Sequence, residues 1–582
     1  MIGSINIEKP NYNKISLENS ELKCDLSSIT EPRFFHEDKI SWKDDQYTII
    51  ESPIKSKQKK IAGILLIKSL VKYGTNKRKI PYYLFKPLDW RYPSFIVASK
   101  YSKRENIYVE IEYHDWQRKI PYGNIVKILG PVGDYNSDIE GILSKYNLNQ
   151  PVNDKRWIKE LKITEFEDNL KQYRKRFDNI TFSIDPSGCK DIDDALHIAD
   201  IDSNQIEVGV HIADVSAFVK PESVIDKIAR ERLSSVYCPH KVITMLPPLL
   251  SYDMCSLLEN QSRLTMSLVM RFDKEGHLLN YQIHPGMIIC QKNFSYQEVD
   301  DLLKLDPISD IDKKLHQLFD FTKNLCDDKE LLLLNSHTMV EKYMILANEL
   351  VCKSLIEDQN LEENNILIRT HCKNNEDLSH IPLEIYNNIY FKFLNSAEYK
   401  SYNKDEEIGH YGLNLKNYTH FTSPIRRYAD IIVHRLLKFK YLKEGNEKDL
   451  DQISAKINEK NRIIKKMERN IHFINVIYKI PEEDCDTSGY VTDINKETFK
   501  ISIYIPEFNL EIDTYLFSSK LNNLLDVVVS DDEISVSNND QKVTLTRYQK
   551  VEVKLIAREK EGYINKKVWA DVISPSFVSL LN

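Results

Sequence analysis

The sequence predicts a multidomain α+β protein in which a small β-barrel precedes a larger α+β domain and a second β-barrel follows it. The chain has 582 residues, which corresponds to three or four domains at about 150 residues each. Short β-rich runs punctuated by proline and glycine recur from residue 61 to about 129 and again from about 489. This spacing is typical of small barrels. Residues 296–480 between them carry mostly helical patterns.

In chain order we expect four segments. Residues 1–55 are polar with little periodicity, and they predict either an N-terminal extension or a truncated first barrel unit. Residues 56–150 are expected to form the first complete barrel. Residues 151–482 are expected to form the central α+β domain, and residues 483–577 the C-terminal barrel.

Two patterns support a mixed central domain. Residues 206–219 alternate apolar and polar positions, which predicts a strand. Val340, Met344, Ala347 and Val351 recur at helical spacing, which predicts a helix with one buried face.

Composition excludes several classes of protein. Hydrophobic residues make up 42% and charged residues 29%, which is a globular balance. No apolar run approaches the roughly 18 residues of a membrane span, and the first residues lack the layout of a signal peptide. The nine cysteines form no CxxC pair, so we expect a reducing compartment, cytoplasmic or alternatively nuclear. P-loop, dinucleotide, nucleophile-elbow and zincin motifs do not occur.

The charge is distributed unevenly. The whole chain has a net charge of −7, but residues 51–100 contain 12 basic and 2 acidic residues, among them Lys77, Arg78 and Lys79. Six aromatic rings interleave with these charges: Tyr73, Tyr82, Tyr83, Phe85, Trp90 and Tyr92. Basic groups with stacking rings are what a single-stranded nucleic-acid platform needs. A solvated surface of a small domain is the alternative interpretation.

Four aspartates within ten residues form the most informative string: Asp185, Asp191, Asp193 and Asp194. Carboxylates at this density repel one another unless a cation neutralises them. Hard oxygen donors suit Mg²⁺, or alternatively Mn²⁺. A solvated acidic loop and helix N-caps are the competing interpretations, and the positions of Gly and Glu exclude an EF-hand. We therefore predict a catalytic metal site here.

A second string runs from residue 411 to 430. Thr422 and Ser423 followed by Pro424 predict the start of a helix. Arg426 and Arg427 would then lie in its first turn, where helix and side chains both attract phosphate. A capped surface helix with exposed arginines is the alternative.

Together these motifs resemble the ribonuclease II (RNB) family of exoribonucleases. The acidic string at 185–195 and the string at 418–435 match its two signatures in order and spacing, and the resemblance covers most of residues 55–575. It implies a cold-shock-like OB barrel, a central RNB catalytic domain and a C-terminal S1-like OB barrel. Residues 129–134 and 236–238 resemble the eukaryotic exosome-associated branch more than the bacterial enzymes. Because only about 50 residues precede the barrel, a PIN domain is expected to be absent.

The resemblance also implies an activity: processive 3′→5′ hydrolysis of single-stranded RNA to nucleoside 5′-monophosphates by two-metal-ion catalysis. The four aspartates match the family's metal ligands, with Asp193 also catalytic. Arg426 matches an arginine at the scissile phosphate, and Tyr296 a catalytic-site tyrosine that holds the terminal nucleotide. Tyr237 matches an aromatic that packs on the RNA 3′ end. The expected RNA-binding residues are Tyr237, Tyr296, Arg426, Arg427, Lys77, Arg78 and Lys79.

Two other functions stay open at this point. One is a non-catalytic RNA-binding protein that keeps the fold as a scaffold, which retention of all four aspartates argues against. The other is a poly(U)-preferring cytoplasmic exonuclease that works without an exosome core. An exosome core is thus an alternative partner beside single-stranded RNA, and we expect no membrane partner.

Overall fold

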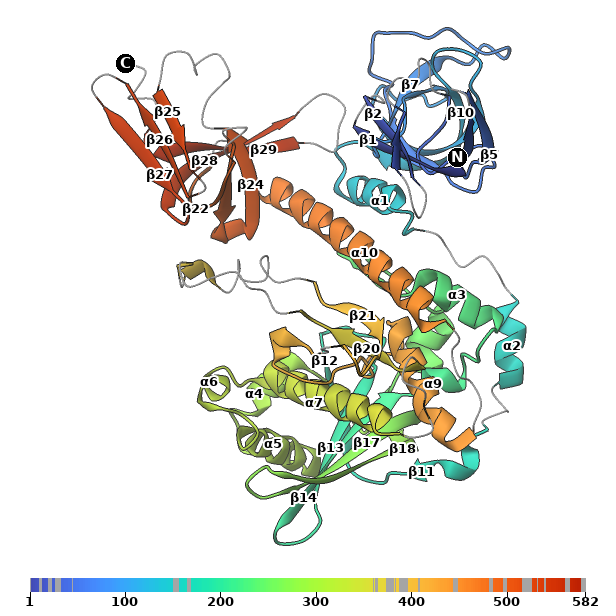
Figure 1. Cartoon of the computed structure of the whole chain (residues 1–582). Helices are drawn as coiled ribbons and strands as arrows, with labels where there is room; N and C mark the ends of the chain where they lie inside the picture. Colours follow the sequence, from blue (N-terminus) through green and yellow to red (C-terminus); the bar gives the residue numbers. More distant parts are fainter. Residues whose placement is uncertain are drawn as a thin grey trace. The chain divides into compact units, whose positions relative to one another are not determined.

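The computed structural model divides the chain into two compact units. One comprises Met1–Gln150, Asp377–Phe391 and Lys465–Asn582, and the other Pro151–Glu376 and Lys392–Ile464 (Figure 1). The structure describes residues 2–9, 13–18, 23–26, 33–43, 46–149, 156–164, 169–358, 361, 365–372, 381–382, 384–386, 396–406, 409–442, 449–480, 485–495, 500–515, 526–530, 532–538, 541–559 and 566–576.

The N-terminal segment is a folded five-stranded sheet of order β3-β2-β1-β4-β5. Its strands are β1 (Ile2–Lys9), β2 (Lys14–Glu18), β3 (Lys23–Asp25), β4 (Lys39–Lys43) and β5 (Gln46–Glu51). A small core of its own includes Ile5, Leu17, Phe34 and Ile40. The described residues of this segment thus form a folded sheet with a core. The domain boundaries predicted from the sequence stay predictions.

The next five strands close into the predicted first barrel, in the order β10-β8-β7-β6-β9. They are β6 (Ile61–Leu65), β7 (Tyr82–Pro87), β8 (Phe95–Ala98), β9 (Ile107–Asp115) and β10 (Tyr122–Pro131), followed by α1 (Tyr135–Lys145). Phe85 and Tyr92 are buried in the barrel core. Counting these two rings as part of a stacking platform was therefore wrong, whereas Trp90 is half exposed.

The C-terminal barrel region contains a sheet of order β24-β23-β22-β28-β29, whose edge strands β24 and β29 contact each other. These strands are β22 (Cys485–Asn495), β23 (Lys500–Ile505), β24 (Leu510–Tyr515), β28 (Lys550–Glu559) and β29 (Lys566–Ser574). A three-stranded sheet is inserted between β24 and β28: β25 (Asp526–Val529), β26 (Glu533–Ser537) and β27 (Lys542–Thr546). Alternate inward residues of both sheets form one core, in which Val491, Ile503 and Val536 are buried.

The central unit is built on a seven-stranded sheet of order β11-β18-β17-β14-β13-β12-β19. Its strands are β11 (Lys175–Arg176), β12 (Thr181–Asp185), β13 (Asp194–Asp200), β14 (Gln205–Ala213), β17 (Ser262–Asp273), β18 (Leu278–Ile289) and β19 (Lys292–Ser295). The pairs β11–β18 and β12–β19 are parallel and the other pairs antiparallel. Two two-stranded sheets lie outside this sheet. One pairs β15 (Val236–Cys238) with β16 (Lys241–Ile243), and the other pairs β20 (Leu367–Thr370) with β21 (Glu398–Ser401).

The helices of this unit are α2 (Trp157–Thr164), α3 (Val224–Arg232), α4 (Tyr296–Leu302), α5 (Asp310–Lys323), α6 (Asp328–Leu332), α7 (Ser336–Ile356) and α9 (Tyr428–Leu442). Helix α10 (Leu450–Lys479) begins in this unit, and its residues from Lys465 on belong to the other unit. Helices α5 and α7 contact strands β13 and β14 (Figure 1). The helical stripe predicted from the sequence is confirmed in α7, where Val340, Ala347 and Val351 are buried. Among the helices that the structure describes, none is long and apolar enough to cross a membrane.

The predicted helix start at Pro424 is wrong, because α9 begins at Tyr428. The Tyr428 N–H donates to the Leu233 carbonyl at 3.0 Å, so it is not available to the preceding turn. The Arg426 carbonyl likewise accepts the Ser235 N–H at 3.0 Å. A neighbouring chain segment thus holds residues 424–427 as a turn outside the helix. The argument that a helix N-terminus binds phosphate at this point therefore fails.

Candidate active site

The acidic motif connects two neighbouring antiparallel strands. Strand β12 ends at Asp185, β13 begins at Asp194, and Phe182 pairs with Leu196. Since adjacent antiparallel strands meet at the joining turn, all four aspartates lie at one end of the sheet. Gly188 has a φ of +77°, a left-handed conformation that glycine adopts without strain. Buried residues on both strands anchor this loop to the core.

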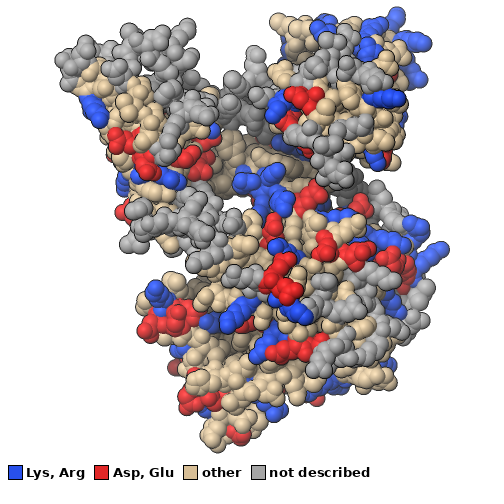
Figure 2. Space-filling model, in the orientation of Figure 1, with Lys and Arg blue, Asp and Glu red and all other residues tan. Residues whose placement is uncertain are grey.

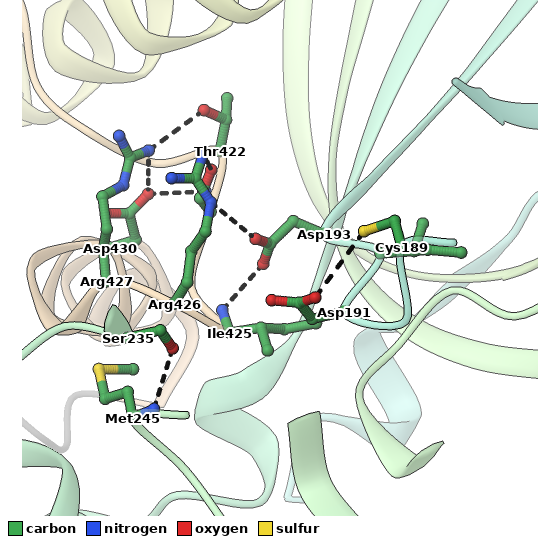
Figure 3. Close-up of polar contacts among 12 residues, drawn as sticks. Cys189, Asp191, Asp193, Ser235, Met245, Thr422, Ile425, Arg426, Arg427 and Asp430 are labelled. Atoms are coloured by element: carbon green, nitrogen blue, oxygen red, sulfur yellow. Dashed lines mark hydrogen bonds and ion pairs between the residues drawn. The ribbon is translucent and has the colours of Figure 1, made fainter. Parts of the chain in front are cut away.

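Asp193 joins the acidic motif to the arginine-containing turn (Figure 3). Its carboxylate is buried, and the Ile425 N–H donates to its Oδ1 at 2.8 Å. Its Oδ2 lies 3.6 Å from Nε of Arg426. The Arg426 side chain is 44% exposed, and its Nη2 donates to Ser423 Oγ at 2.9 Å. The two motifs, distant in sequence, therefore form one site with a cation at its surface.

The carboxylates of this site carry more charge than their surroundings compensate. Burial, together with the charge of Asp191, raises the pKa of Asp185 to about 6. Burial and the charge of Asp185 raise the pKa of Asp194 to about 8. Burial also raises the pKa of Asp193 well above its usual range, although Arg426 opposes this effect. Additional positive charge at the site would stabilise the ionised carboxylates.

Tyr237 contacts the acidic motif directly. It lies on β15, its ring is 46% exposed, and its hydroxyl donates to Asp191 Oδ2 at 2.6 Å. The Cys189 thiol approaches the other oxygen of Asp191, at 3.8 Å (Figure 3). The structure thus brings Tyr237 together with the predicted aspartates. Its contact with the RNA 3′ end stays a prediction.

Tyr296 approaches the same cluster from another element. It is the first residue of α4, which Ser295 and Glu298 cap reciprocally. Burial and the nearby charges of Asp194 and Asp185 raise the pKa of Tyr296. The ring of His337, at the start of α7, lies 4.9 Å from the Tyr296 ring. No sequence pattern indicated His337, because its approach depends on how α4 and α7 pack.

Arg427 differs from Arg426 in its surroundings. Its Nη2 donates to Asp430 Oδ1 at 2.8 Å, and only 21% of its side chain is exposed. The same carboxylate oxygen accepts the Ser423 N–H at 2.7 Å, so this ion pair holds the turn in place. The structure therefore gives Arg427 a supporting contact, and its predicted binding of RNA stays a prediction.

Lys77, Arg78 and Lys79 belong to the other compact unit, where they are exposed between β6 and β7. Asn76 shapes this turn, since its side-chain oxygen accepts the N–H groups of Arg78 at 2.9 Å and Ile80 at 3.0 Å. The side chains are thus displayed on an ordered turn. Their role in binding RNA stays a prediction.

A buried charged network behind the site was missed in the sequence. Asp214 is buried, and it accepts Arg174 Nη2 and Lys438 Nζ, both at 2.6 Å. Lys438 lies on α9, which directly follows the turn that carries Arg426. The network therefore fixes α9 against the chain that follows β14. Its three residues are far apart in sequence, so no local pattern could reveal it.

The donor chemistry of the acidic motif fits a hard divalent cation, although the arrangement is incomplete. Across the described part of the chain, no group of three or more His, Cys, Asp or Glu side chains stands in a metal-holding arrangement. However, one carboxylate oxygen of Asp185 is buried and has no hydrogen-bond partner. Asp185 and Asp194 also repel each other. An unpartnered hard oxygen beside uncompensated carboxylates is what Mg²⁺ or Mn²⁺ binds.

Comparisons with known proteins agree with this architecture. A family profile described as RNB domain matches residues 174–444, and one described as Dis3-like cold-shock domain 2 matches residues 82–147. The Dis3-like match agrees with the resemblance of residues 129–134 to the exosome-associated branch of the family. Ribonuclease R of Chlamydia pneumoniae is 30% identical over 458 residues, which cover 67% of this chain and 66% of the relative. Exosome complex exonuclease RRP44 of Mus musculus is 28% identical over 511 residues, covering 75% and 53%.

Solved structures share the fold. Mycoplasma genitalium RNase R in complex with ribose methylated single-stranded RNA has a TM-score of 0.76 at 19% identity, covering 98% of this chain and 100% of that one. Yeast Ssd1, a pseudonuclease, has a TM-score of 0.64 at 16% identity, covering 99% and 97%. The chain spans from about half to about two thirds of the length of the curated relatives above. With its RNB domain and the Dis3-like cold-shock domain before it, the chain belongs to the RNB family.

Proposed function

We propose that this protein is a 3′→5′ hydrolytic exoribonuclease that degrades single-stranded RNA processively to nucleoside 5′-monophosphates. The observation that carries the proposal is the contact of Asp193 with Ile425 and Arg426, which unites four carboxylates and a half-exposed guanidinium in one site. Carboxylates for a cation and a guanidinium for a phosphate are the groups that phosphodiester hydrolysis needs. Relatives named Ribonuclease R and exosome complex exonuclease support the same activity.

Two Mg²⁺ ions, or alternatively Mn²⁺, are the proposed cofactors. Asp185 and Asp194 would hold them together with Asp191 and Asp193. When bound, such ions supply an activated water and stabilisation of the leaving 3′ oxygen. Arg426 is oriented by Ser423 and Asp193, and it would place positive charge beside the scissile phosphate.

The two tyrosines would hold the 3′ end of the RNA. Tyr237 has a half-exposed ring, on which a base can stack with a gain of about 1–3 kcal/mol. Tyr296 lies near the same acidic cluster, at the start of α4. Stacking does not discriminate strongly between bases, so we expect a broad range of RNA sequences.

Single-stranded RNA is accordingly the proposed partner, as it is in the complex of Mycoplasma genitalium RNase R. An exosome core is the alternative partner, because the relative RRP44 is named an exosome complex exonuclease. The nine cysteines are scattered and form no CxxC pair, which favours an intracellular compartment.

A second function has two specific observations in its favour. The structural neighbour Ssd1 is a pseudonuclease, and the described aspartates do not form a three-ligand metal arrangement. An RNA-binding protein without nuclease activity would share both properties. It would bind RNA with the same surfaces and leave it intact.

Incubation of the protein with 5′-labelled single-stranded RNA and Mg²⁺ tests both functions. An exonuclease from the 3′ end yields a descending ladder that ends in a short labelled product. Asp193→Asn is the matched control, because the amide keeps the shape and the oxygen that accepts the Ile425 N–H. Intact RNA in a sample that binds it would support the scaffold function instead, and internal fragments at early times would indicate an endonuclease.

A further inference from the structure

Exposed apolar side chains are concentrated between residues 305 and 333. Ile308 is 90% exposed, Leu332 87%, Leu333 69% and Leu305 63%, and Leu331 adds 42%. We name these five residues the leucine patch. Soluble proteins seldom expose clustered large apolar residues unless these meet a partner. None of the five contributes to the candidate active site.

Two hydrogen bonds join the chain segments next to the two parts of the leucine patch. The Ser336 N–H at the start of α7 donates to Asp300 Oδ1 in α4 at 3.0 Å, and Ser336 Oγ donates to the Tyr296 carbonyl at 3.2 Å. Leu305 follows Asp300 by five residues, and Leu333 precedes Ser336 by three. At most about 3.6 Å of chain per residue keeps them within about 18 Å and 11 Å of the junction.

The short helix α6 presents its leucines on a fixed support. Asp327 and Glu330 cap the helix reciprocally. Lys342 of α7 donates to Glu330 at 2.6 Å, which ties α6 to α7. Leu334 packs against the main core, while the three leucines before it remain outside. The exposed side chains therefore belong to an anchored element.

The charge around the patch restricts its occupant. Residues 296–335 contain 10 acidic and 5 basic residues, and acidic side chains cluster on the left flank of the central unit, where α4, α5 and α6 lie (Figures 1 and 2). Three of the lysines pair with aspartates three residues away: Lys304, Lys313 and Lys323. An acidic surface repels RNA and anionic lipid. It also disfavours a second copy of the same patch, since like charges would then face each other.

We propose that the leucine patch is a docking surface for a protein partner that presents a basic amphipathic helix. Leucines would bury against the apolar face of that helix, and the acidic rim would meet its lysines or arginines. Residues of helix α4 form this junction with Ser336, and one of them is Tyr296, which lies beside the candidate active site. A docked partner would therefore contact the element that carries Tyr296. The proposal does not depend on whether the protein cleaves RNA.

A fluorescent helical peptide of leucine and lysine, with leucines on one face, serves as the probe. We expect it to bind the full-length protein in an anisotropy titration. The double variant Leu332→Ser/Leu333→Ser should weaken binding by about tenfold or more, as truncation of interface anchors does. Hydrogen exchange should slow in α4 and α6 of the wild-type protein when the peptide binds.

Leu70→Ser/Val71→Ser is the matched control, because both residues are well exposed but belong to the basic loop of the first barrel. It should leave peptide binding unchanged. A peptide with glutamate in place of lysine should bind much more weakly. Equal binding to wild-type protein and the Leu332/Leu333 variant, or no binding at all, would overturn the proposal. So would a dimer in sedimentation that the serine variant dissolves.

Discussion

Replacing Asp214 by asparagine should destabilise the central unit strongly, because Asp214 forms ion pairs with two buried cations. Arg174 and Lys438 both contact it at 2.6 Å, and Ser216 donates to its Oδ1 at 2.9 Å. An asparagine keeps the volume and an acceptor for Ser216 but removes the negative charge. Arg174 and Lys438 would then lose the negative charge that both of them contact.

The expected loss of stability follows from the cost of removing one partner of a buried ion pair. Removing one partner of a buried ion pair costs about 3–5 kcal/mol. For a unit of this size, each kcal/mol lowers the melting temperature by about 2–4 °C, so a decrease of about 6–20 °C should result. An exposed pair offers the contrast: Asp310→Asn, which breaks the surface pair with Lys313, should change stability by less than about 1 kcal/mol.

The pH dependence gives a second signature of the same network. Burial alone would raise the pKa of Asp214, but the charges of Lys438 and Arg174 outweigh it and hold the pKa below its usual range. A depressed carboxyl pKa adds stability that is complete above the unfolded value of about 4 and is lost as the pH falls through the folded value. The difference between wild type and Asp214→Asn should therefore be constant from about pH 6 to 8 and shrink in acid.

Thermal and urea unfolding, followed by near-ultraviolet circular dichroism, would measure these differences. Adding Lys438→Met to Asp214→Asn removes one of the two cations, while Arg174 keeps its hydrogen bonds to the carbonyls of Thr265 and Gly286. The double variant should recover part of the lost stability, since contacting sites couple by about 0.5–3 kcal/mol. A single variant within about 1 kcal/mol of wild type, or a double variant less stable than the sum of its parts, would refute the reasoning.

Three further outcomes are expected. Asp193→Asn should lower single-turnover cleavage by about 10²-fold or more while RNA binding by anisotropy persists, and activity within tenfold of wild type would exclude its catalytic role. EDTA should stop cleavage and added Mg²⁺ or Mn²⁺ should restore it, because the donors are hard oxygens; full activity after exhaustive chelation would contradict this. Replacing Lys77, Arg78 and Lys79 by alanine should flatten the slope of log K against log[salt] by about 2, at about 0.7 per phosphate contact, and an unchanged slope would remove these residues from the RNA-binding surface.

The order of barrels and α+β domain could be predicted because each depends on local periodicity. Strands β6–β10 appear where short β-rich runs between prolines and glycines indicated strands. Helix α7 appears where helical spacing of apolar residues indicated a helix. The N-terminal sheet was harder to recognise, since its core is small and its strands are short. Phe85 and Tyr92 show what composition could not predict. The sequence places aromatic rings among lysines, but the closing of the barrel determines which rings are buried.

In the candidate site, too, local features could be predicted from the sequence and contacts between distant residues could not. The four aspartates lie on one loop, so their proximity followed from the sequence. The start of α9 did not, because the Tyr428 N–H bonds to Leu233, a residue remote in sequence. Arg426 contacts Asp193, whereas Arg427 contacts Asp430. Two adjacent arginines in the sequence did not indicate that their partners differ.

The central unit contains two buried acidic sites whose carboxyl pKa values are shifted in opposite directions. This contrast indicates which of the two sites can bind a cation. Asp214 has two cationic partners, and its pKa lies below the usual range. In the acidic motif, Arg426 opposes the effect of burial on Asp185 and Asp194 without outweighing it, and the pKa of both carboxyls is raised instead. A compensated carboxylate stabilises the fold and has no capacity for another cation. An undercompensated cluster costs stability and gains it back when positive charge binds, so a ligand-dependent rise in melting temperature with Mg²⁺ should depend on Asp185 and Asp194 and not on Asp214.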